Sequence, residues 1–180
     1  MNAAADLNHV TVKLPSGETR ELGTFWKERP VVLSFVRHLG CIFCRKEVTQ
    51  LRKRLPEIRG KGAELVVVGT GTPAQAARFA KEYGGDFSRR GRSRPPIVPS
   101  RRIQARRVRH ILSRRGAGSP RCGRVRPPPG RTQGDPIQLG GMFVITPDQR
   151  VLFEHMARNS ADLADIDKAL ASLDNGAAAK

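Results

Sequence analysis

Lysine, aspartate and glutamate are all absent from residues 88–131 of this 180-residue chain, although fifteen arginines lie there. That segment holds +15 of the formal net charge of +17, so the rest of the chain, with 18 basic and 16 acidic side chains, is nearly neutral. The segment also lacks the aromatic side chains that stack on nucleic-acid bases. We therefore interpret the protein as an ordinary domain with an arginine-rich insert, which would attract nucleic acid only by non-specific charge.

Long apolar runs and a disulfide framework are also missing. No apolar run approaches the ~18 residues of a membrane span, and residues 1–8 lack the basic and apolar regions of a signal peptide. Three cysteines are too few to build a fold on disulfides, and two of them form a Cys-x-x-Cys pair, which is typical of a reducing compartment. We predict a cytoplasmic protein with no membrane partner and a single domain over residues 1–180.

The Cys-x-x-Cys pair is the most informative feature. Cys41 and Cys44 follow the apolar run 31–36 and precede a helix-patterned stretch over 45–59. The unpaired N–H groups at a helix start favour a thiolate, the reactive form of cysteine. Arg37, at the end of the preceding run, would add a positive charge. We predict that Cys41, Cys44 and Arg37 are the catalytic residues.

Other interpretations of these residues stay open. The two thiols could be buried structural side chains or metal ligands, but a zinc site needs four ligands and the chain has no second Cys-x-x-Cys. We therefore expect no metal and no bound cofactor. Cys122 could be a resolving cysteine, although it lies within the insert. His38 is either an acid–base group or an exposed loop histidine, and Arg45 either a thiolate partner or a solvated charge.

Hydrophobic periodicity predicts alternating strands and helices. The expected strands are 10–14, 19–22, 31–36, 63–68, 142–145 and 150–155, and the expected helices are 24–28, 45–59 with a break near Pro56, 73–83 and 160–173. This order, with Cys-x-x-Cys after the first central strand, resembles the thioredoxin-like fold. The fold class is then α/β, with a central mixed sheet flanked by helices and an irregular arginine-rich insert.

Two segments carry a closer resemblance. Residues 36–45, VRHLGCIFCR, resemble the FVRHFGCPFCRE block of peroxiredoxin-like proteins of the alkyl hydroperoxide reductase/thiol-specific antioxidant (AhpC/TSA) group, with Ile42 in place of the usual proline. Residues 132–143, TQGDPIQLGGMF, are similar to a second block of that family. The resemblance covers about residues 8–86 and 131–173.

This resemblance implies a peroxiredoxin-like thiol–disulfide oxidoreductase. Cys41 would attack a peroxide or a disulfide, Cys44 would form a disulfide with it, and an external dithiol such as a thioredoxin would reduce the pair. Residues 36–39 replace the Pro-x-x-x-Thr-x-x-Cys signature of true peroxiredoxins, so peroxide and disulfide substrates both remain open. Reduction of a small lipid-like endoperoxide is one alternative, and a non-catalytic basic module that binds nucleic acid or a partner is another.

The insert at 88–131 departs from the family. Relatives have a strand and a short helix in this part of the chain, whereas arginine, proline, serine and glycine predominate here. Arginine codons of the CGN type encode Ala, Val, Gly, Asp or Glu when read one base later, and residues 102–110 then become similar to the family sequence. We predict that 88–131 is a frame-shifted stretch without stable packed structure.

Overall fold

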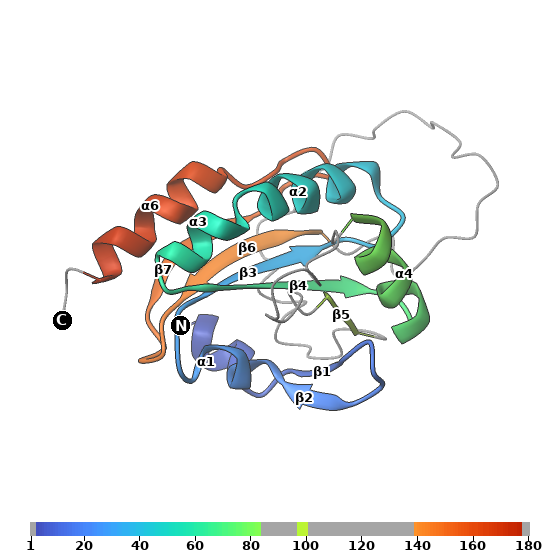
Figure 1. Ribbon diagram of the computed structural model, residues 1–180, viewed down its shortest axis with the longest axis horizontal. Coiled ribbons are helices and arrows are strands. Elements are labelled where there is room, and N and C mark those ends of the chain that lie inside the picture. The colour runs from blue at the N-terminus through green and yellow to red at the C-terminus, as the bar shows by residue number, and fades with distance from the viewer. Residues whose placement is uncertain (1–2, 84–96, 101–138, 178–180) are drawn as a thin grey trace.

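A computed structural model describes residues 3–83, 97–100 and 139–177 (Figure 1). Its centre is a five-stranded sheet in the order β5–β4–β3–β6–β7. These strands are β3 (Val31–Val36), β4 (Glu64–Thr70), β5 (Ile97–Ser100), β6 (Gly141–Ile145) and β7 (Val151–Met156). β3, β4 and β5 run parallel, whereas β6 and β7 are antiparallel to their neighbours, so the sheet is mixed, as predicted.

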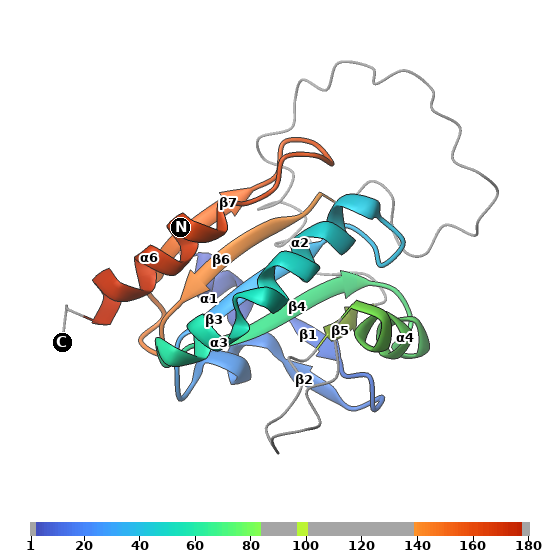
Figure 2. The same cartoon turned by 45° about the horizontal axis from the view of Figure 1, so that its top comes forward.

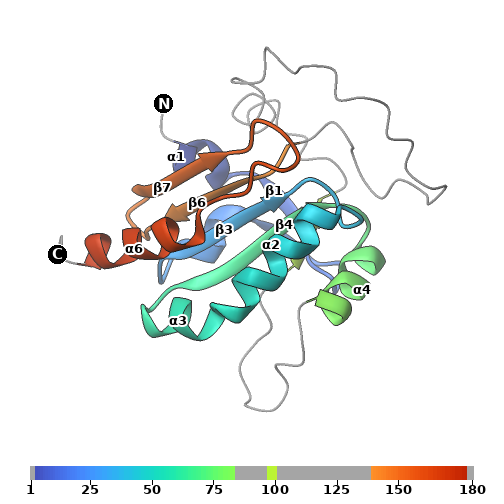
Figure 3. The same cartoon turned by 90° about the horizontal axis from the view of Figure 1, so that it is seen from above.

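Helices cover one face of this sheet, and the N-terminal segment covers the other. α2 (Ile42–Lys53), α3 (Leu55–Gly60), α4 (Pro73–Tyr83) and α6 (Ile166–Ala177) pack on the first face. Figure 3 shows α2, α3 and α6 lying over the strands. The second face carries α1 (Ala3–Asn8), the hairpin β1 (Thr11–Lys13) with β2 (Thr19–Glu21), and a 3₁₀ helix at Leu22–Trp26. The predicted α/β fold class, a central mixed sheet flanked by helices, is confirmed.

The central strand β3 contributes side chains to the hydrophobic cores on both faces of the sheet. All of its residues are buried, because both faces of a central strand are covered. Side chains alternate along a strand, so Val32 and Val36 pack under the helices while Leu33 and Phe35 pack against the N-terminal segment. Ser34 shares the helix-facing side with Val32 and is the one hydroxyl in this strand. It therefore needs a hydrogen-bond partner on that side.

Several helix boundaries differ from the predictions. The helix after the cysteines begins at Ile42 rather than Arg45. Its predicted break lies at Arg54, because Pro56 falls in the first turn of α3, where proline needs no backbone N–H. The helix expected at 24–28 is the 3₁₀ helix just described. The helix α1 was not predicted, because six residues are too few to show a period.

The last helix also starts later than predicted. α6 begins at Ile166, not after Ser160, and the carboxylate of Asp165 accepts a 3.1 Å hydrogen bond from the backbone N–H of Lys168. Asp165 therefore caps the helix in place of Ser160. Among the described residues, no helix has the length and apolar composition that a membrane span requires.

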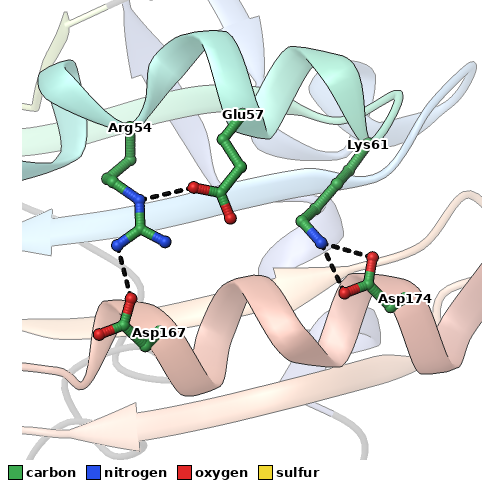
Figure 4. A network of polar contacts seen from close by, with 5 residues as sticks. All are labelled: Arg54, Glu57, Lys61, Asp167 and Asp174. Atoms are coloured by element: carbon green, nitrogen blue, oxygen red, sulfur yellow. Dashed lines mark hydrogen bonds and ion pairs between the residues drawn. The ribbon is translucent and has the colours of Figure 1, made fainter.

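α3 and α6 meet through ion pairs above a buried side chain. Figure 4 shows Arg54 between Glu57 and Asp167, with N–O distances of 2.6 and 2.5 Å, and Lys61 at 2.5 Å from Asp174. Beneath these exposed pairs, the described core includes Leu170 of α6.

The prediction for the arginine-rich insert is corrected at one place. Residues 97–100 form β5, whose backbone pairs with β4 from Val67 opposite Ile97 to Thr70 opposite Ser100. The prediction that 88–131 has no packed structure is wrong for these four residues, since Ile97 and Val98 are β-branched and suit an edge strand. The predictions for 88–96 and 101–131, the frame shift included, lie outside the described residues.

Candidate functional site

The two cysteines lie where β3 leads into α2. Figure 2 shows α2 along β3 and β4, with its first turn at the end of β4. Cys41 has extended backbone angles and precedes the first helical residue, and its carbonyl accepts a 3.0 Å hydrogen bond from the N–H of Arg45. Its side chain makes no capping hydrogen bond. Cys41 and Cys44 are both reduced and buried.

Cys44 is held as a thiol. Burial, the neighbouring Cys41 and a hydrogen bond between the two side chains raise the pKa of Cys44 to about 12, and hydrogen bonds from the backbone at His38 and Arg37 oppose the shift. At neutral pH, Cys44 is therefore protonated and in contact with Cys41. A thiol in this state needs to lose its proton before it attacks another sulfur.

The loop before Cys41 is fixed by short hydrogen bonds. The N–H of Gly40 donates to Nδ1 of His38 over 3.2 Å, so this nitrogen carries no proton. Burial, with Arg37 and Arg45 nearby, lowers the pKa of His38. The side chain is a half-buried, neutral imidazole rather than an exposed histidine, which corrects that interpretation. The hydroxyl of Thr70 donates to the carbonyl of Arg37 over 2.6 Å.

The two neighbouring arginines point to different places. The guanidinium of Arg45 lies 5.2 Å from the ring centre of Tyr83, over α4, in a cation–π contact. Arg37 instead lines a pocket that also exposes Cys44. Of these two cations, Arg37 is therefore the one that shares a cavity with a site cysteine.

That pocket lies between α2, the sheet and the connection from β7 to α6. Its apolar lining includes Phe35 and Leu163, and Cys41 is not part of the lining. Gly140 forms one wall, where a Cβ atom would lie 2.7 Å from the carbonyl oxygen of Phe35, so only glycine fits. The titratable side chains in the lining are Arg37, Cys44, Glu47, His155 and Asp162.

Glu47 was missed by sequence reasoning. Its side chain is only 6% exposed, and its Oε1 accepts a 3.2 Å hydrogen bond from the hydroxyl of Ser34. Burial raises the pKa of Glu47 to about 7, against the opposing effect of Ser34. A signal existed, because Glu47 falls on the apolar face of the helix beside Val48 and Leu51.

The surface beside the pair is apolar. Ile42 is 72% exposed and Phe43 is 38% exposed, between the two buried cysteines. Within residues 3–83, 97–100 and 139–177, no group of three or more His, Cys, Asp or Glu side chains is arranged to hold a metal ion. Cys122, the possible resolving cysteine, lies outside the described residues.

Comparison with known proteins identifies the family. Residues 3–94 match the model of the AhpC/TSA family. The chain is 26% identical to the prostamide/prostaglandin F synthase of Salmo salar, over 88% of this chain and 83% of that protein. It is 29% identical to peroxiredoxin-like 2C of Mus musculus, over 93% and 78%.

Solved structures agree on the fold. Peroxidoxin BcpB from Mycobacterium tuberculosis superimposes with a TM-score of 0.64 at 24% identity, covering 92% of this chain and 91% of its own. A peroxiredoxin-like protein from Aquifex aeolicus gives a TM-score of 0.65 at 14% identity, with coverage of 92% and 82%. The chain therefore belongs to the AhpC/TSA family, and it is a peroxiredoxin-like, thiol-dependent oxidoreductase with the thioredoxin fold.

Proposed function

We propose that this protein reduces peroxides or disulfides through a Cys41–Cys44 dithiol. The observation that carries the proposal is the contact between the two thiols at the start of α2, with Cys44 held protonated beside Cys41. Cys41 stands next to the unpaired N–H groups at the helix start, which favour negative charge. This difference between the two thiols supports Cys41 as the attacking residue and Cys44 as the resolving one.

With a peroxide, the cycle has three steps. The Cys41 thiolate attacks the terminal peroxide oxygen, the O–O bond breaks, and an alkoxide leaves as the alcohol after it takes a proton. Cys44 then attacks the sulfur of the Cys41 sulfenic acid, which forms the disulfide and releases water. An external dithiol such as a thioredoxin reduces this disulfide by thiol–disulfide exchange and becomes oxidised itself. A disulfide substrate enters by the same exchange chemistry.

Single cysteine variants test the assignment. Cys41→Ser should abolish turnover with peroxide and an external dithiol. Cys44→Ser should still consume one equivalent of peroxide and should stop at a sulfenic acid, which a dimedone probe traps. Retained oxidation in Cys41→Ser together with loss of the first step in Cys44→Ser would reverse the two roles.

Arg37 is proposed to supply positive charge to the reacting groups. Its place in the lining of the pocket beside Cys44 supports this role. Arg37→Ala should slow the first oxidation step, and Arg37→Lys should restore part of the rate because it keeps the charge but not the planar donor group. Equal rates in all three proteins would show that the charge of Arg37 does not act on the reacting groups.

A small lipid-like endoperoxide is the second candidate substrate. The apolar side chains of Leu163 and Ala164, in the same lining as Arg37, would suit an apolar molecule with an anionic group. Similarity to prostamide/prostaglandin F synthases of several vertebrates agrees with this candidate. Reduction of a cyclic lipid endoperoxide with a higher kcat/KM than hydrogen peroxide would support it, and the absence of any reduction would exclude it.

The proposal extends to the domain organisation and the cellular compartment of the protein. The five-stranded sheet joins strands from both sides of the 88–131 insert, which supports a single domain over 1–180 interrupted by that insert. A dithiol that works by reversible oxidation suits a reducing compartment, and we propose the cytoplasm. Protease digestion that leaves one resistant core containing both 3–83 and 139–177 would support the single domain, whereas two separable fragments would contradict it.

A further inference from the structure

The Ser34–Glu47 pair is a buried polar contact that the cycle above does not use. Glu47 projects from α2 toward the sheet, and Ser34 reaches it from β3 with a 3.2 Å hydrogen bond. Glu47 is 6% exposed, and the hydroxyl of Ser34 is its hydrogen-bond partner. Burying such a carboxyl costs stability, because burial penalises its charged form. Such a group invites a functional explanation.

Cys44 and Glu47 lie on the same side of α2. They are three positions apart, which places them one above the other on a helix, and both line the same pocket. The pocket has room for about one water molecule, and polar side chains, among them Asn159 and Asp162, form part of its lining. A water molecule in this pocket would connect the thiol with the carboxyl and would carry a proton between them.

We propose that Glu47, oriented by Ser34, accepts and returns the proton of Cys44 during disulfide formation and reduction. The proposal rests on the Cys41–Cys44 cycle described above and assigns a residue to its proton transfers. Cys44 is the thiol that needs such a partner, since burial and Cys41 hold its pKa at about 12. Glu47 titrates at about 7, so both of its protonation states are populated under neutral conditions.

The proton count closes in both directions. During disulfide formation, ionised Glu47 takes the proton of Cys44, the Cys44 sulfur bonds to the sulfur of Cys41, and the departing hydroxide takes that proton to become water. During reduction, an external thiolate attacks the Cys41 sulfur, and the Cys41–Cys44 bond breaks with its electron pair on Cys44. Glu47, which was left ionised by disulfide formation and has since taken a proton from solvent, then supplies the proton that makes Cys44 a thiol again.

Other charged groups face the same space. Arg37, which directly follows β3, and His155 from β7 both line the pocket. The Nε2 atom of His155 lies 3.3 Å from the carbonyl oxygen of Asp162 and 3.6 Å from its carboxylate. The imidazole therefore already has a polar partner. Glu47 shares the helix with Cys44, lies three residues from it and lines the same pocket.

The test follows each chemical step against pH. Reduced protein is mixed with hydrogen peroxide between pH 5 and 9, and loss of the sulfenic acid reports the disulfide-forming step. In the unchanged protein, this rate should rise with pH and level off near pH 7, where Glu47 becomes ionised. Glu47→Gln should slow the step by about 10²-fold and remove the inflection. Glu57→Gln, the same change on the exposed surface of α3, should keep the inflection.

Ser34→Ala is the variant that separates proton transfer from packing. Ser34 stabilises the charged carboxylate, so its loss should move the inflection to higher pH while the plateau rate is still reached. If Glu47→Gln does not fold, the pH profile of Ser34→Ala tests the proposal on its own. An unmoved inflection in Ser34→Ala, or an unchanged profile in Glu47→Gln, would overturn the proposal. Failure of the unchanged protein to form the disulfide at all would instead overturn the cycle and the role of Glu47 with it.

Discussion

The hydroxyl of Thr70, at the end of β4, donates a 2.6 Å hydrogen bond to the backbone carbonyl of Arg37. Arg37 directly follows β3, so this bond ties the neighbouring strand to the loop that leads into Cys41. The position of the first cysteine is thus set by contacts between two strands and not by the helix alone.

Thr70→Val removes that bond at nearly constant volume. Because Thr70 is buried and the carbonyl of Arg37 loses a donor, we expect a loss of about 1–3 kcal/mol in the free energy of unfolding. Thr49→Val is the matched control, since its hydroxyl bonds to a carbonyl within the same helix, that of Arg45. Urea titration measures both, and equal losses would show that the strand-to-loop bond has no special weight.

Alkylation should distinguish the two cysteines. Iodoacetamide reacts with thiolates, and the raised pKa of Cys44 keeps that thiol protonated far above neutral pH. On the 38–45 peptide at pH 7, we expect the label on Cys41, and labelling of Cys44 should grow only as the pH becomes strongly alkaline. Fragment-ion mass spectrometry locates the label. Preferential labelling of Cys44 at pH 7 would contradict the environment described for it.

Stability should depend on pH through Glu47. Its pKa is about 7 in the folded chain and 4.5 in the reference state, so the folded protein binds the extra proton between these values. Rising pH therefore weakens the fold by roughly 3 kcal/mol over that window, and the contribution stays lost above it. Glu47→Gln should remove this slope in denaturant titrations from pH 5 to 8.

Glu57→Gln provides the control for that slope. Arg54 lowers the pKa of Glu57, so its contribution is present above its unfolded pKa and is lost only as the solution becomes more acidic. The difference between Glu57→Gln and the unchanged protein should be constant from pH 5 to 8. A slope that survives in Glu47→Gln would have to come from another group.

The packing of α6 on the rest of the fold should depend on its buried apolar side chains more than on its surface ion pairs. Leu170 is 1% exposed in the helix-side core, and Leu170→Ala should cost about 2–5 kcal/mol. Asp174, which pairs with Lys61, is 61% exposed, so Asp174→Asn should have a small effect that fades as salt is added. Comparable losses in both variants would indicate that the ion pairs of Figure 4 hold the helix.

The parts predicted well are those with a local signal. The run 31–36 forms β3 with the same bounds, because a short run in which five of six residues are apolar fits a buried strand. The helix expected at 73–83 is α4 with the same bounds, and Thr72 caps it in a reciprocal pair with Gln75. The central mixed sheet was predicted from the order of the elements and from the position of the cysteines.

The parts that were missed depend on tertiary contacts. The helix period places Glu47 on the apolar face, but its hydrogen bond with Ser34 comes from another element, and no local period encodes that contact. The late start of α6 reflects the bond between the Asp165 carboxylate and the N–H of Lys168, whereas Ser160 looked equally suitable in the sequence. β5 was missed because its four residues lie among arginines and prolines.

The central claim is that Cys41 and Cys44 form a disulfide with each other. Trypsin would release both on one peptide, 38–45, and would release Cys122 on a separate peptide, 122–124. After one equivalent of peroxide and alkylation of the remaining thiols, mass spectrometry should find the 38–45 peptide unlabelled and lighter by two hydrogen atoms. A labelled 38–45 peptide, or one joined to the 122–124 peptide, would contradict the account.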